Sequence, residues 1–228
     1  MDIDSNDTLV LYDFCGTIVD VQTPNEYVRY VKRRLNIKIG FVEYFRIFLN
    51  KIGFIKRYNY IFPKIAVNKS LLLYQIRGIE YDVLDALARD YYYEMVKPHI
   101  IPQVLDTMEF HRKNGATLSI ISAGYEIYLK YFAREFSIPI VIASEYEYKN
   151  DIFTGHVKGR DNYGKEKLEK VIKYWGKDNL KLYKNIVGYT DSLSDLPLLE
   201  ICNEKVFINH GNTVEEWMSK EGTKVICY

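Results

Sequence analysis

Short apolar runs alternate with amphipathic stretches along most of the chain. Apolar runs that predict buried strands lie at residues 8–14, 117–122, 138–143, 185–188, 205–208 and 223–226. Apolar residues recur at helical spacing over 104–114, 125–136, 165–175, 193–201 and 214–220. Strands that alternate with helices are typical of a mostly parallel sheet covered on both faces. The pattern therefore predicts a doubly wound α/β core.

One long segment breaks this alternation. Between residues 22 and 98, helical periodicity interrupted by Gly, Pro and Asn predicts helices at 26–35, 41–52, 68–76 and 81–96. We therefore expect an all-helical insertion, residues 22–98, within a core formed by residues 1–21 and 99–228. Two short runs at 145–148 and 153–157, joined by Lys-Asn-Asp, predict a β-hairpin in the second part of the core.

The composition narrows the class of protein. A length of 228 residues suits one domain with an insertion, and a net charge of +1 gives no general argument for binding nucleic acid. The three cysteines form no Cys-x-x-Cys pair, which argues against a disulfide framework or structural zinc and for a reducing compartment. The polar, acidic start is unlike a secretory signal, and no apolar stretch has the length of a membrane span. We expect a cytoplasmic protein.

The charge is nevertheless uneven, because residues 27–64 hold ten basic side chains and one acidic side chain. Residues 40–62 of this segment are also rich in Phe and Tyr. The segment could attract an anionic substrate or make a peripheral contact with an anionic membrane. We favour a third interpretation, a pair of helices with the apolar side packed inward and the lysines in solvent.

Polar residues with catalytic potential follow the predicted strands. Asp13 ends the first strand, Ser122 with Ala123 and Gly124 ends the second, and Lys165 begins a helix. Asp191 and Asp195 follow a third apolar run, four residues apart. The carboxyl ends of parallel strands share one edge of a sheet, where open α/β folds bind ligands. A carboxylate at that edge can be a nucleophile, a metal ligand or both.

This ordered set of motifs resembles the haloacid dehalogenase superfamily, and within it the phosphoserine-phosphatase-like branch of small-molecule phosphatases. The resemblance implies that the insertion is a cap over the active-site edge and that Asp13 forms an aspartyl-phosphate. It implies that a small phosphorylated metabolite is bound by Ser122, Ala123, Gly124 and Lys165. It also implies Mg²⁺ ligated by Asp13, the backbone carbonyl of Cys15 and Asp191, with Asp195 as a further ligand or as the group that orients one.

Cys15 departs from the family pattern, which normally has a second aspartate at this position. That residue protonates the leaving oxygen and then activates water, and a thiol, with an ordinary pKa near 8.5, is less suited to this role. Three interpretations follow: a phosphatase in which another group supplies the proton, a phosphotransferase, or a phospholigand-binding or membrane-associated lipid-phosphate module. We favour the phosphatase because the other motif positions hold competent side chains. Nothing in the sequence indicates an oligomeric state.

Overall fold

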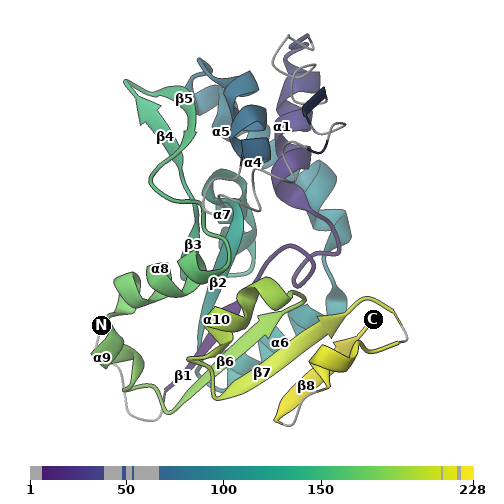
Figure 1. Cartoon of the computed structure of the whole chain (residues 1–228), viewed down its shortest axis with the longest axis vertical. Coiled ribbons are helices and arrows are strands. Elements are labelled where there is room, and N and C mark those ends of the chain that lie inside the picture. Colours follow the sequence, from purple (N-terminus) through teal and green to yellow (C-terminus); the bar gives the residue numbers. More distant parts are fainter. Residues whose placement is uncertain (1–6, 39–47, 50–52, 54–66, 212, 220–221) are drawn as a thin grey trace.

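The computed structural model describes residues 7–38, 48–49, 53, 67–211, 213–219 and 222–228, and its main feature is a six-stranded sheet (Figure 1). The strand order is β3-β2-β1-β6-β7-β8, and every neighbouring pair is parallel. The bounds are β1 Thr8–Tyr12, β2 Thr117–Tyr125, β3 Ile140–Ser144, β6 Asn185–Thr190, β7 Glu204–Asn209 and β8 Thr223–Cys227.

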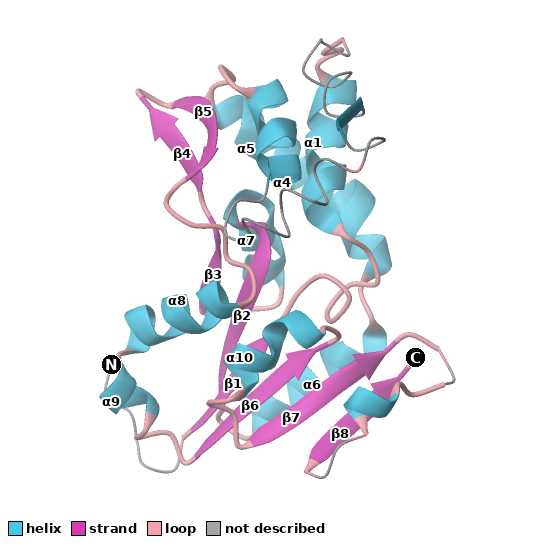
Figure 2. Ribbon diagram, viewed as in Figure 1, coloured by secondary structure: helices cyan, strands magenta, loops and turns pink. Residues whose placement is uncertain are grey.

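Both faces of the sheet are buried, as alternation along β1 shows. Val10 and Tyr12 belong to one buried apolar cluster, and Leu9 and Leu11 belong to the other. The covering helices are α6 Pro102–Lys113, α7 Glu126–Glu135, α8 Lys165–Trp175, α9 Lys177–Leu180 and α10 Leu196–Leu199. Figure 2 shows α6 and α10 on opposite sides of β6 and β7. The doubly wound α/β prediction is therefore confirmed.

Two predicted helices are shorter than expected. Residues 193–201 form a 3₁₀ turn, Leu193–Asp195, followed by α10, with Pro197 in the first turn of α10, where its missing N–H costs nothing. Among the described residues of 214–220, only Glu216–Met218 is helical, and of these three only Met218 is buried, which gives no apolar stripe. The short helix α9 was not predicted.

The described part of the predicted insertion is helical and lies beyond the carboxyl edge of the sheet, at the top of Figure 1. It comprises α1 Thr23–Arg34, α4 Val67–Leu73, a 3₁₀ turn Tyr74–Ile76, α5 Tyr81–Tyr91, a π-helical turn Tyr92–Val96 and a 3₁₀ turn Lys97–His99. The helix predicted at 41–52 and the basic aromatic segment 40–62 lie outside the described residues, apart from 48, 49 and 53.

The predicted hairpin, β4 Tyr146–Lys149 and β5 Ile152–Val157, joins this helical layer. Gly78 N–H donates to Phe153 O at 2.8 Å, and Phe153 N–H donates to Ile79 O at 2.9 Å. Tyr81 N–H donates to Asp151 O at 2.8 Å. The layer above the sheet therefore contains helices and a hairpin supplied by the second part of the core. None of the described helices has the length and apolar character needed to cross a membrane.

Candidate active site

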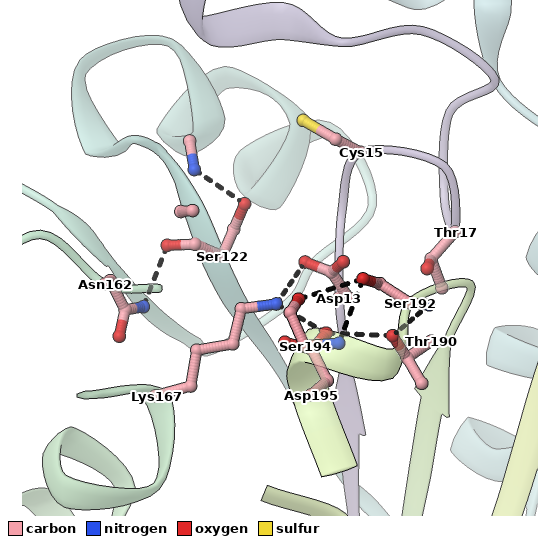
Figure 3. A network of polar contacts seen from close by, with 12 residues as sticks. Asp13, Cys15, Thr17, Ser122, Asn162, Lys167, Thr190, Ser192, Ser194 and Asp195 are labelled. Atoms are coloured by element: carbon pink, nitrogen blue, oxygen red, sulfur yellow. Dashed lines mark hydrogen bonds and ion pairs between the residues drawn. The ribbon is translucent and has the colours of Figure 1, made fainter. Parts of the chain in front are cut away.

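Asp13 lies directly after β1 and is held from both sides. Its backbone N–H donates to Tyr189 O of β6 at 2.9 Å, which fixes the backbone between two parallel strands. Its carboxylate accepts from Lys167, whose Nζ is 2.8 Å from Asp13 Oδ1 and 2.7 Å from Asp195 Oδ2 (Figure 3). Thr190 Oγ1 also donates to Asp195 Oδ2 at 2.8 Å. The site therefore contains a buried ammonium group between two carboxylates.

The lysine of this group is Lys167, whereas the predicted Lys165 lies outside the pocket that Lys167 lines. The Lys165 side chain is 77% exposed and lies 4.0 Å from Glu169, whereas that of Lys167 is 3% exposed. Two residues along an α-helix are separated by roughly 200°, so the two lysines point in opposite directions. The sequence did carry the signal, because Lys167 is four residues before Val171 and eight before Trp175, on the buried face of α8.

Ser122, Ala123 and Gly124 lie opposite this lysine (Figure 3), in the irregular last part of β2 before α7, and this segment is called the Ser122 turn below. Ser122 is buried, and its Oγ accepts a hydrogen bond from Gly124 N–H at 2.9 Å. Pairing of β2 with β3 is irregular between Ile121 and Tyr125, where the backbone bends toward α7. A pocket of about 160 Å³ is lined by the three turn residues and by Asp13, Cys15, Lys167 and Asp191. Every predicted site residue except Lys165 and Asp195 thus lines this pocket, and the fully buried Asp195 joins the group through its contact with Lys167.

Asp191 packs against the turn that follows Asp13. Gly16 has φ +77°, and a Cβ there would lie 2.0 Å from Asp191 Oδ2, so both the backbone conformation and the space require glycine. His210, which was not among the predicted site residues, has Nε2 2.8 Å from Gly16 O and 3.9 Å from Asp191 Oδ2. It reaches the site because it follows β7, whose carboxyl end lies at the same edge of the sheet.

Negative charge exceeds positive charge around Asp13. Burial raises the pKa of Asp13 to about 7, and repulsion from Asp195 and Asp191 adds to this against the opposing effect of Lys167. Burial also raises the pKa of Asp191. Among the described residues, no group of three or more His, Cys, Asp or Glu side chains could hold an ion by itself. Two carboxylates completed by backbone, water and phosphate oxygens nevertheless fit the hard oxygen ligands of Mg²⁺.

The environment of Cys15 keeps its thiol protonated at neutral pH. Burial, followed by repulsion from Asp13, raises the pKa of Cys15 to about 11. Cys15 Sγ lies 3.1 Å from Thr23 Oγ1, and Thr23 Oγ1 lies 2.7 Å from Tyr128 OH. The position of the usual second aspartate is therefore occupied by a neutral thiol in contact with the start of α1.

Comparison with known proteins identifies the family of this chain. A family model of haloacid dehalogenase-like hydrolases matches residues 10–200, so the chain belongs to this family. A histidinol-phosphatase from Neisseria meningitidis serogroup C (strain 8013) is 22% identical over 223 residues, with 96% of this chain and 98% of the relative covered. The chain is therefore a hydrolase of the haloacid dehalogenase family with a phosphatase among its relatives.

Solved structures show the same fold. A protein with unknown function from Bordetella pertussis Tohama I superposes with a TM-score of 0.78 at 18% identity, covering 97% of this chain and 98% of that one. A phosphoserine phosphatase in its apo form superposes with a TM-score of 0.56 at 15% identity, covering 89% and 86%. Both superpositions cover most of this chain.

Proposed function

We propose that this protein is a magnesium-dependent phosphatase of small phosphomonoesters that works through an aspartyl-phosphate on Asp13. The observation that carries the proposal is the position of Asp13, at the carboxyl end of β1, 2.8 Å from Lys167 and in one pocket with the Ser122 turn. A nucleophile, a fixed cation and phosphate-binding donors are the parts that phosphoryl transfer requires.

Each group has a defined task in this proposal. The Asp13 carboxylate attacks phosphorus, the bond to the leaving oxygen breaks, and that oxygen takes up a proton from solvent. Water then attacks the aspartyl-phosphate and gives up a proton to solvent, which releases phosphate and regenerates Asp13. Lys167 and the donors of the Ser122 turn hold the phosphate oxygens. Mg²⁺, bound by Asp13, the Cys15 carbonyl and Asp191, would offset the repulsion between nucleophile and phosphate. Asp195 is fully buried and binds Lys167, which favours an orienting role over metal ligation.

Residues 22–98 would form the cap that closes over this pocket. Gln22 and Pro24, at the start of α1, line the pocket on the cap side, and Tyr163 lines it from the core. A leaving group attached to the bound phosphate would pass between them. This position gives the cap a direct part in substrate choice and supports a small phosphorylated metabolite.

The test is phosphate release with Mg²⁺ from a panel of phosphomonoesters. Histidinol phosphate comes first because a relative over nearly the whole chain is a histidinol-phosphatase, and phosphoserine comes second. We expect Asp13→Asn to lower kcat about 1,000-fold or more, because the amide is no nucleophile. Asp20→Asn is the control, since Asp20 is half-exposed and binds His99 outside the pocket. An Asp13→Asn variant as active as the parent would rule the mechanism out.

Cys15 defines the alternatives, a phosphotransferase or a catalytically weak phospholigand-binding module. We expect the parent to turn over and Cys15→Asp to raise kcat about 10- to 100-fold, because a carboxyl group is the better general acid and base. Cys15→Ser controls for loss of the thiol alone. A phosphorylated acceptor in place of free phosphate would select the phosphotransferase, and turnover by Cys15→Asp alone would select the binding module.

A further inference from the structure

A second lysine, the partly buried Lys69 of α4, reaches from the helical layer to the Ser122 turn. Its Nζ lies 2.6 Å from Ala123 O and 2.5 Å from Asp161 Oδ1, and 4.7 Å from the centroid of the Tyr125 ring. The Lys69 side chain is 14% exposed. Asp161 is held in turn by Ser144 Oγ, which donates to the same Oδ1 at 2.6 Å. Lys69 therefore links the helical layer to the core through a hydrogen bond, an ion pair and a contact with an aromatic ring.

Lys69 contacts the carbonyl of the peptide group that joins Ala123 to Gly124, and the N–H of the same group donates to Ser122 Oγ at the site. In a trans peptide the carbonyl and the N–H point in opposite directions, so a donor that fixes Ala123 O also fixes Gly124 N–H. The preceding peptide is held in the same way, because Asn162 Nδ2 donates to Ser122 O at 2.8 Å (Figure 3) and thereby fixes Ala123 N–H. Ser122 O thus accepts from an amide, and Ala123 O accepts from the Lys69 ammonium group at 2.6 Å and, at the longer distance of 3.4 Å, from Ser144 Oγ.

The effect of Lys69 continues to the Ser122 hydroxyl. A cation on Ala123 O strengthens the dipole of that peptide and makes Gly124 N–H a better donor. Gly124 N–H donates to Ser122 Oγ, which occupies a lone pair of that oxygen and leaves the hydroxyl hydrogen to be donated elsewhere. Lys69 donates to Ala123 O, Gly124 N–H donates to Ser122 Oγ, and the Ser122 hydroxyl is then free to donate into the pocket.

We propose that Lys69 is a positioning residue that orients and polarises the phosphate-binding turn when the cap lies against the core. The proposal rests on the proposed function, because it concerns the same phosphate. Lys69 belongs to the cap, whereas Ser122 and Gly124 belong to the core, so the donor set for phosphate is completed by the position of the cap. Phosphate binding and cap closure then favour one another, as linkage requires.

Another ion pair between the helical layer and the core provides the control. Lys97, at the end of the helical layer, pairs with Glu135 of α7 at 2.5 Å, with side chains 44% and 27% exposed. This pair also ties the layer to the core, but its members are absent from the pocket lining and Glu135 lies at the far end of α7 from the turn. Lys97→Met therefore removes a tether without removing a contact to Ala123 O.

The experiment measures the affinity of the Mg²⁺-loaded full chain for inorganic phosphate, together with the amide proton shift of Gly124 by NMR. We expect Lys69→Met to weaken phosphate binding about tenfold, because a charge-assisted hydrogen bond behind the turn is lost. We also expect Lys69→Met to move the Gly124 amide proton upfield. The phosphate affinity of Lys97→Met should stay within twofold of that of the parent. Should Lys69→Met not fold, Lys69→Gln is expected to shift both readouts in the same direction.

Two results would overturn the proposal. One is phosphate affinity within twofold of the parent with an unmoved Gly124 amide, which would make Lys69 a structural ion pair. The other is an equal loss in Lys97→Met, which would assign the effect to tethering in general. Neither result depends on turnover, so failure of the inference is distinguishable from failure of the phosphatase assignment, which would appear as bound phosphate with no hydrolysis.

Discussion

Lys167 and Lys69 sit in opposite electrostatic settings. Lys167 lies in the core between the carboxylates of Asp13 and Asp195, with Asp191 nearby, so negative charge is in excess. Lys69 comes from the cap layer and meets one carboxylate, Asp161, and one backbone carbonyl. In the proposed mechanism the core region holds the reactive charges, and a metal cation would offset its excess of carboxylates. The Lys69 region is balanced and acts on the orientation of the backbone.

The largest effect that separates the two regions is expected from Lys167→Met. This change removes the cation beside the nucleophile and should lower kcat/KM about 100- to 1,000-fold. Lys165→Met, two residues away on the exposed face of α8, should remain within twofold of the parent. Steady-state kinetics with and without saturating Mg²⁺ make the measurement.

The same kinetics on Lys69→Met complete the comparison. A loss at Lys69 as large as the loss at Lys167 would contradict the division between reactive and orienting lysines. An effect at Lys165 would contradict the register of α8 and restore the lysine first expected from the sequence.

Sequence patterns located the sheet and the carboxyl edge correctly because both depend on local signals. Apolar runs of strand length specify β1, β2 and β6, and a polar residue at the end of each run must appear at the edge where parallel strands end. Asp13, Ser122 and Asp191 follow from that rule alone. The predicted Lys165 and the buried Lys167 lie on the same helix, α8. The motif position favoured Lys165, whereas the spacing to Val171 and Trp175 marks Lys167 as the lysine on the buried face.

The contacts that escaped prediction join segments far apart in the chain. Lys69 and Asp161 are separated by 92 residues, and His210 and Gly16 by 194, so no local pattern links them. The hairpin β4–β5 was found, but its packing on residues 78–81 depends on how the layers meet. The same limit applies to the helical insertion, because its periodicity predicts helices without predicting which side chain reaches the site.

The smaller expected effect is a pH dependence of stability that belongs to the Asp13 region. The pKa of Asp13 rises from an ordinary value near 3.9 to about 7 on folding, mainly through burial. The stabilisation linked to this group is therefore fully present below about pH 4 and is lost as pH rises through 7. With metal removed by a chelator, the free energy of unfolding should fall between pH 5 and pH 8 by on the order of 1–3 kcal/mol more in the parent than in Asp13→Asn.

Urea unfolding at the two pH values measures this difference. Added Mg²⁺ should reduce the fall in the parent, because a divalent cation favours the ionised carboxylates of Asp13 and Asp191 in the folded state alone. The chelated Asp13→Asn variant serves as the reference, since its amide has no charge to lose. An equal fall in parent and variant would mean that the excess charge around Lys167 is already balanced within the protein, and the two lysines would then differ in position alone.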